Sequence, residues 1–212
     1  MTNKELFYFA GKCLSLDEQP EFREEIIQRS YDDLIDWQRF VKLCSNHLVL
    51  PVIYIKFRAH HILDHLPEEL AQFLVEVYEL NEERNRQVRN QLEIIIGLLN
   101  QNNIYPILLK GTGNLLDDVY SDLGERIIGD IDILVLEEDY LKSARLLEQE
   151  GYSHNLPPFF DINTMKHYPR LYKRGMHVDV EIHRIPVREE FSKQFNTNII
   201  LEEKKAINTT KE

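Results

Sequence analysis

The sequence has few cysteines, no long apolar run and no excess of basic residues. Its two cysteines, Cys13 and Cys44, lie in no metal-binding or redox spacing. Without a signal-peptide pattern, this usage predicts buried thiols in a reducing cytoplasm. No apolar run approaches the ~20 residues of a membrane-spanning helix, and LEIIIGLL at residues 92–99 is far shorter than that. We therefore expect a cytoplasmic chain with no membrane association.

Acidic residues outnumber basic ones, 36 to 25, which gives a formal net charge of −11. Nonspecific binding to nucleic acid depends on a basic surface, so bulk nucleic-acid binding is not expected. A local basic patch around one polyanionic ligand is still compatible with this charge. The length of 212 residues allows one sizeable core or two small domains.

Residues 4–100 have the apolar spacing of helices. The segment 19–57 repeats apolar residues every three or four positions and breaks at Pro51. The segment 66–103 predicts one long helix, with Pro67 in its first turn and a stop at Asn102 and Asn103. A helical N-terminal region is therefore expected over residues 1–84.

After residue 104 the pattern changes to short strands alternating with helices. This predicts an α/β (α+β) fold in which a small mixed sheet forms a core over residues 85–200, followed by a tail at 201–212. The expected elements are a strand at 105–111, a helix at 113–123, a strand at 127–136, a helix at 137–152 and a hairpin at 170–186 that turns at Arg174–Gly175.

Two aspartates, Asp130 and Asp132, interrupt the apolar strand RIIGDIDILVL. Residues at i and i+2 of a strand share a face, so these like charges repel unless something positive lies between them. The later strand places Asp179, Glu181 and His183 on its polar face. If the two strands are neighbours, their carboxylates converge, and converging carboxylates bind hard divalent cations. The alternative reading of each strand alone is a turn, a helix cap or a solvated face.

The segment LLKGTGNLL precedes the aspartates and has a glycine between a strand and a helix. Such a glycine lets backbone amides approach a phosphate, and Lys110 and Thr112 add a cation and a hydroxyl at the same place. Arg126 lies four residues before Asp130. It is suited either to holding a phosphate bidentately or to a salt bridge with the preceding helix.

The ordered set LLKG, R-x-x-x-DIDILV, EGY and VEIHR resembles the nucleotidyltransferases of the DNA-polymerase-beta superfamily. It is similar in particular to a bacterial family of uncharacterised nucleotidyltransferases, and the LLKGTG turn is also similar to that of abortive-infection-type nucleotidyltransferase toxins. The superfamily's usual turn has Gly-Ser or Gly-Gly, whereas this chain has Lys110–Gly111 followed by Thr112. The resemblance covers roughly residues 85–187.

This resemblance implies metal-dependent transfer of a nucleoside monophosphate from an NTP to an acceptor, with release of pyrophosphate. The implied cofactor is Mg²⁺, as two ions, with Mn²⁺ as an alternative. The acceptor stays open between a small molecule, a protein and an RNA end. The implied catalytic and metal-binding residues are Asp130, Asp132 and Glu181, and the implied nucleotide-binding residues are Lys110, Gly111, Thr112, Gly113 and Arg126.

Two other functions are compatible with the pattern. One is a catalytically degenerate module that binds a nucleotide or a protein partner, but such a domain should have lost a carboxylate or the glycine, and this chain keeps them all. The other is a metal-dependent phosphohydrolase, which usually needs His and Asp ligands from several strand ends that the sequence does not provide.

Overall fold

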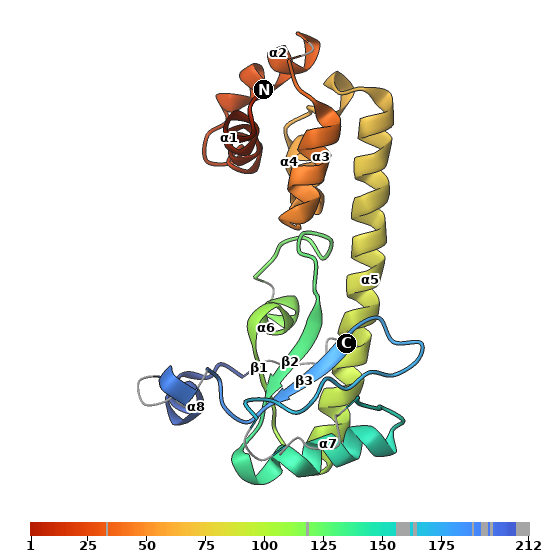
Figure 1. Ribbon diagram of the computed structural model, residues 1–212, viewed down its shortest axis with the longest axis vertical. Helices are drawn as coiled ribbons and strands as arrows, with labels where there is room; N and C mark the ends of the chain where they lie inside the picture. The colour runs from red at the N-terminus through yellow and green to blue at the C-terminus, as the bar shows by residue number, and fades with distance from the viewer. Residues whose placement is uncertain are drawn as a thin grey trace. The chain divides into compact units, whose positions relative to one another are not determined.

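The structure is a computed structural model, and its contacts divide the chain into two compact units. One unit comprises Met1–Asn85 with Ser121–Ile127, and the other comprises Arg86–Tyr120 with Ile128–Glu212. The domain boundaries expected from the sequence stay predictions, and part of the expected tail, 207–212, lies outside the described residues. The structure describes residues 1–32, 34–117, 119–155, 162, 165–187, 189–191, 195 and 197–206 (Figure 1).

The first unit is helical, as the sequence predicts. Its α1 begins with a capping box, in which the Thr2 and Glu5 side chains each bind the other's backbone amide. Pro51 lies in the first turn of α4, and the helical conformation is interrupted just before that helix, at residues 47–49. Phe9, Phe40 and Phe57 are fully buried in the core. The elements are α1 (Asn3–Leu14), α2 (Phe22–Tyr31), α3 (Trp37–Asn46), α4 (Leu50–Ala59), the 3-10 helix η1 (Leu63–His65) and the first half of α5 (Glu68–Gln101).

No single helix among the described residues is both long and apolar enough to cross a membrane. The pair α3 and α4 reaches that length and composition only when the two helices are taken together, and they meet at a bend of 119°.

Two asparagines one turn apart on α5 bind the inserted segment Ser121–Ile127. The Asn81 Nδ2 donates to the carbonyl of Gly124 at 2.7 Å. The Asn85 Nδ2 donates to the carbonyls of Leu123 at 2.7 Å and Arg126 at 2.6 Å. Because both asparagines are buried, these hydrogen bonds satisfy polar groups that have little access to water.

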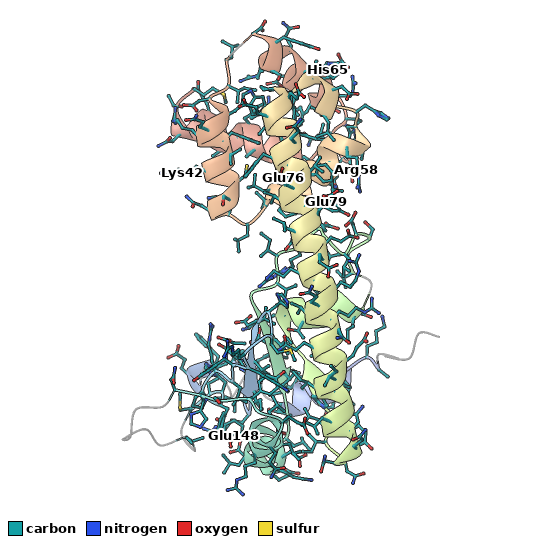
Figure 2. The ribbon with its side chains drawn as sticks, turned by 90° about the vertical axis from the view of Figure 1, so that its right-hand side faces the viewer. Lys42, Arg58, His65, Glu76, Glu79 and Glu148 are labelled. Carbon is teal, nitrogen blue, oxygen red and sulfur yellow. The ribbon has the colours of Figure 1, made fainter. Side chains whose placement is uncertain are left out.

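A second set of contacts fixes the same segment through Asp122. The Tyr78 hydroxyl donates to Asp122 Oδ1 at 2.9 Å, and Arg58 Nη2 lies 3.1 Å from Asp122 Oδ2. The Arg58 guanidinium, labelled in Figure 2, also lies 5.2 Å from the ring centres of Tyr54 and Tyr78. Gly124 leaves room for the Tyr78 ring, because a Cβ there would lie 2.5 Å from Tyr78 Cε2.

The second unit contains a small mixed sheet, as the sequence predicts, with the strand order β1-β2-β3. The edge strand β1 is antiparallel to β2, while β2 and β3 are parallel. Figure 1 shows α6 beside β2. The elements are the second half of α5, β1 (Ile107–Leu108), α6 (Lys110–Leu116), β2 (Asp130–Leu134), η2 (Glu137–Asp139), α7 (Tyr140–Gln149), β3 (Asp179–His183), η4 (Glu189–Phe191) and α8 (Thr197–Glu203).

The register of β2 and β3 places their polar residues side by side. Asp132 is paired with Glu181, and Leu134 with His183. Side chains alternate along a strand, so the intervening Ile133 and Ile182 point to the other face, where both are fully buried. This buried apolar face fixes the register, because a shift by one residue would bring the isoleucines to the polar side.

Two elements differ from the sequence-based expectation. The helix expected at 113–123 begins earlier, at Lys110, and ends at Leu116, so the glycines lie in its first turn and not before it; Asp118, within the expected range, lies outside the described residues. The predicted hairpin does turn at Arg174–Gly175. Its first arm, however, makes only isolated bridges, Leu171 to Val180 and His167 to His183, with Pro169, which has no N–H to donate, between them.

Candidate active site

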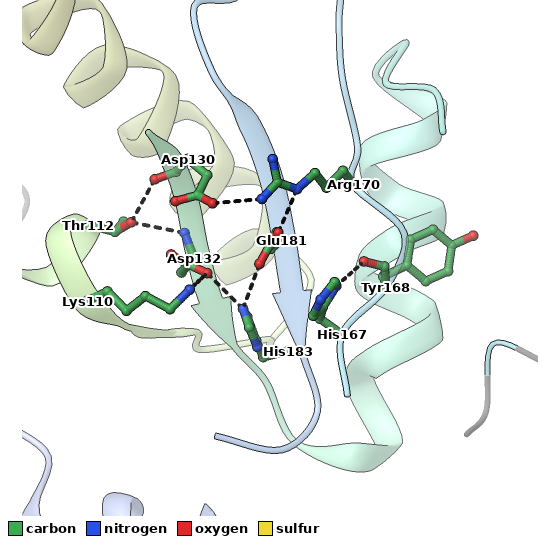
Figure 3. Close-up of polar contacts among 9 residues, drawn as sticks. All are labelled: Lys110, Thr112, Asp130, Asp132, His167, Tyr168, Arg170, Glu181 and His183. Carbon is green, nitrogen blue, oxygen red and sulfur yellow. Dashed lines mark hydrogen bonds and ion pairs between the residues drawn. The ribbon is translucent and has the colours of Figure 1, made fainter. Parts of the chain in front are cut away.

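Three carboxylates lie together on the polar face of β2 and β3. Asp132 and Glu181 are paired across the two strands and are 1% and 6% exposed. Asp130 precedes Asp132 by two residues on the same face and is half-buried (Figure 3). The structure therefore brings together the three residues that the sequence points to, although their catalytic roles stay predictions.

Asp132 is held by two positive or hydrogen-donating side chains. Lys110 Nζ lies 2.6 Å from its Oδ1, and His183 Nε2 lies 2.8 Å from the same oxygen. Burial raises the pKa of Asp132, but the hydrogen bonds from His183 and Lys110 outweigh it and lower that pKa to about 2. The charge of this buried aspartate is thus stabilised by the protein itself.

Arg170 bridges the other two carboxylates. Its Nε lies 2.7 Å from Glu181 Oε1, and its Nη2 lies 3.4 Å from Asp130 Oδ2. The negative charge of Glu181 raises the pKa of Arg170. Burial and the charges of Asp132 and Glu181 raise the pKa of Asp130, so the cluster disfavours the charged form of this aspartate.

The first turn of α6 and the residue before it form hydrogen bonds to the backbone of β2. The Thr112 hydroxyl accepts from the Asp132 amide at 2.9 Å and donates to the Asp130 carbonyl at 3.4 Å, and the Leu109 amide donates to the Asp132 carbonyl at 3.0 Å. Lys110, between them, has φ of +52°, a left-handed conformation that is strained for a lysine. Strain of this kind persists where the surroundings enforce it, and it clusters at functional sites.

The expected nucleotide-binding residues have different surroundings. Lys110 contacts the carboxylate of Asp132, and the Thr112 hydroxyl bonds to the backbone of Asp130 and Asp132. Gly111 is buried in α6. Gly113 faces the edge strand, since a Cβ there would lie 3.2 Å from the Leu108 carbonyl oxygen. Arg126 belongs to the first unit, where its carbonyl accepts from Asn85. Its role in phosphate binding stays a prediction.

His183 belongs to the cluster, although it was not among the residues chosen from the sequence. The signal was the strict alternation of β3, which puts His183 on the same face as Glu181. Its Nε2 lies 2.8 Å from Asp132 and 3.4 Å from Glu181 Oε2. Its Nδ1 is buried and has no hydrogen-bond partner among the described residues. This pattern favours the tautomer with the proton on Nε2, because an unpaired buried N–H costs more than an unpaired lone pair.

The donor atoms of this cluster fit a divalent metal ion. Asp132, Glu181 and His183 each offer a ligand atom within 4.8 Å of the others, so the three could hold a metal. Carboxylate oxygens suit hard ions such as Mg²⁺ and Mn²⁺. The side chains of Lys110 and Arg170, which neutralise the carboxylates here, are 53% and 59% exposed, so both have room to move when another cation arrives.

A parallel strand pair with buried carboxylates, beside a strained strand-to-helix junction, is an arrangement suited to metal-dependent chemistry on phosphates. Comparison with protein families identifies the group to which the chain belongs. The model of the uncharacterised nucleotidyltransferase family matches residues 33–211, so the chain is a member of this family, as its motifs predict. Comparisons with curated proteins and with solved structures find no significant match.

Proposed function

We propose that the protein is a metal-dependent nucleotidyltransferase that moves a nucleoside monophosphate from an NTP to an acceptor. The observation that carries this proposal is the in-register pair Asp132–Glu181, with Asp130 beside it and Lys110 in contact with it. In the reaction, an acceptor oxygen would form a bond to the α-phosphorus while the bond from that phosphorus to the bridging β-phosphate oxygen breaks, and pyrophosphate would leave with that electron pair. Where the acceptor is a hydroxyl, its proton would pass to a base, a role that Glu181 could take in place of binding the metal.

The metal ions would be held by the carboxylates. Asp130 and Asp132 would bind both ions, and Glu181 would bind the one nearer the acceptor. When bound, such ions neutralise charge on the attacking and leaving oxygens of a phosphoryl displacement. Mg²⁺ is the cofactor that this oxygen-rich donor set favours, and Mn²⁺ suits it as well.

The other side chains would position these groups. His183, donating from Nε2, would hold Asp132 Oδ1 in place beside a bound metal. Lys110 and Arg170 contact Asp132 and Glu181, and both would exchange these partners for phosphate oxygens when a nucleotide binds. Most of the rate enhancement in such a site comes from positioning and charge stabilisation.

The retained carboxylates distinguish this function from its main rival, a degenerate nucleotide-binding or protein-interaction module. Asp130, Asp132 and Glu181 are all present and converge, at the energetic cost of bringing like charges together. A module that only binds a partner would gain nothing from that cost.

The test is to incubate the purified chain with each α-labelled NTP, Mg²⁺ or Mn²⁺, and a cell extract, and then to identify the labelled product. Asp132→Asn should lower transfer about a hundredfold or more, by analogy with removal of one preorganised electrostatic group. Asp179→Asn is the matched control, since Asp179 is a half-buried aspartate on the same face of β3 and should retain most activity. Full transfer by Asp132→Asn would contradict the proposal.

A further inference from the structure

A cavity of about 590 Å³ lies in the second unit along the open edge of the sheet. Its volume is in the range that binds one small molecule and is too small for a folded protein. Lys110 lines this cavity and also reaches Asp132, so a ligand in the cavity would lie next to the carboxylates. The walls come from α5, β1, α6 and the segment after α8: Ile96, Asn100, Tyr105, Pro106, Ile107, Leu108, Lys110, Gly113, Asn114, Asp117, Lys204, Lys205 and Ala206.

The charge of this cavity differs from that of the chain. Lys110, Lys204 and Lys205 face a single acid, Asp117, in a protein whose formal net charge is −11. Lys205 Nζ lies 2.5 Å from Asp117 Oδ1, with the lysine side chain 74% exposed. Such exposed ion pairs contribute little stability, so an anionic ligand can replace Asp117 as the partner of Lys205 at small cost.

The cavity also offers groups that recognise a flat heteroaromatic ring. Tyr105 is 72% exposed at the cavity wall, so its ring is accessible to a ligand that stacks on it. The amides of Asn100 and Asn114 supply donors and acceptors.

The backbone of β1 adds a further donor and acceptor. Because the Leu109 amide bonds to Asp132, the antiparallel pattern turns the amide and carbonyl of Leu108 away from β2, toward the open edge that the cavity borders. Ring-stacking surface, hydrogen-bonding groups and ammonium groups are the combination that a nucleotide requires.

We infer that this cavity binds the base and ribose of the nucleoside triphosphate, with Tyr105 against the base and Lys110 leading the phosphates to the carboxylates. Lys204 and Lys205 then close the cavity over the anionic ligand. This inference rests on the proposed function for the choice of ligand, and it adds the residues that would select the nucleotide.

The experiment measures ligand binding to the full chain by calorimetry. The ligands are inorganic tripolyphosphate and the α,β-methylene analogues of the four NTPs, which cannot be cleaved between the α- and β-phosphates. Tyr105→Ala should lower the affinity for the tightest-binding analogue about tenfold, which is the size of one base-stacking contact. It should leave the affinity for tripolyphosphate unchanged. The double variant Lys204→Ala/Lys205→Ala should lower the affinity for both the analogue and tripolyphosphate. Tyr8→Ala and Lys42→Ala, which remove exposed side chains of the first unit, are the matched controls and should change neither.

Equal affinity of Tyr105→Ala and the wild type for every analogue would overturn the inference. If the wild type still transfers nucleotides in that case, only the assignment of the cavity fails. If instead the wild type binds an analogue through Tyr105 but transfers no nucleotide in any extract, the proposed function fails while the cavity assignment stands. Tyr105 is exposed, so its replacement should leave the circular dichroism spectrum and the melting temperature unchanged.

Discussion

Replacement of Asp132 by asparagine tests which charge effect dominates at the centre of the site. From the sequence alone, like-charge repulsion predicts that the metal-free variant is no less stable than the wild type. The structure predicts the opposite, because Lys110 and His183 both bind Asp132 Oδ1 and hold the pKa of Asp132 at about 2. The attraction to these two side chains therefore exceeds the combined cost of burial and of repulsion by neighbouring carboxylates.

The size of the effect follows from the pKa. A fall from the ordinary value of 3.8 to about 2 corresponds to about 2 kcal/mol of stability, at ~1.4 kcal/mol for each pKa unit. Since the pKa is lower in the folded protein, this stability is fully present above about pH 4 and is lost as the pH falls toward 2. Asp132→Asn should lose about the same amount at neutral pH, because asparagine keeps the shape of the side chain and removes its charge.

The assay is urea unfolding in EDTA at pH 7 and at pH 3, for the wild type, Asp132→Asn and the control Asp179→Asn. The variant should unfold at lower urea than the wild type at pH 7, and the gap should narrow at pH 3. Addition of Mg²⁺ should then raise the midpoint of the wild type more than that of Asp132→Asn. A variant as stable as the wild type at pH 7 in EDTA would show that repulsion among the carboxylates outweighs the bonds from Lys110 and His183.

Two further variants test other parts of the structure. Gly124→Ala should destabilise the protein by about 1–3 kcal/mol in urea unfolding, because the new Cβ would lie 2.5 Å from the Tyr78 ring. Gly97→Ala is the control and should be neutral or stabilising, since, apart from its chain neighbours and the backbone of its own helix, no described atom would lie within 4 Å of the new Cβ. Equal changes in stability for the two variants would contradict the packing described for Gly124. Lys110→Met should raise the Kd for tripolyphosphate about tenfold by loss of a charged hydrogen bond, with Lys42→Met as control; an unchanged Kd would remove Lys110 from the phosphate site.

The sequence predicts the carboxylate cluster because that cluster depends on local periodicity. Two strands with apolar residues at every second position turn one apolar face toward the core, so their acids share the other face. The same alternation applies to His183, but its distance from Asp132 depends on the register of β2 against β3, which periodicity within one strand does not determine. Arg170 is harder still to predict, since it reaches Asp130 and Glu181 from an arm that is held by isolated bridges.

Local sequence patterns also could not predict where α6 starts or that Ser121–Ile127 belongs to the first unit. The glycines of LLKGTG indicated a turn, but the turn is made by Lys110 itself, whose positive φ no propensity predicts for lysine. The local pattern divides Ser121–Ile127 between the end of a helix and the start of a strand. Its carbonyls are instead bound by Asn81 and Asn85, about forty residues earlier in the chain. Contacts over that separation leave no periodic trace in the sequence.

The insertion of Ser121–Ile127 into the helical unit also constrains how the protein can be synthesised and divided. On the ribosome, Asn81 and Asn85 emerge long before the carbonyls of Leu123 and Arg126 that they bind. The helical unit therefore cannot complete these polar contacts until β1 and all of α6 have also been made. A fragment that ends at residue 85 would lose the hydrogen bonds of Asn81 and Asn85 to this segment, each worth about 0.5–1.5 kcal/mol. A fragment meant to contain the complete helical unit must therefore extend to residue 127, and it then also contains β1 and Lys110 with its positive φ.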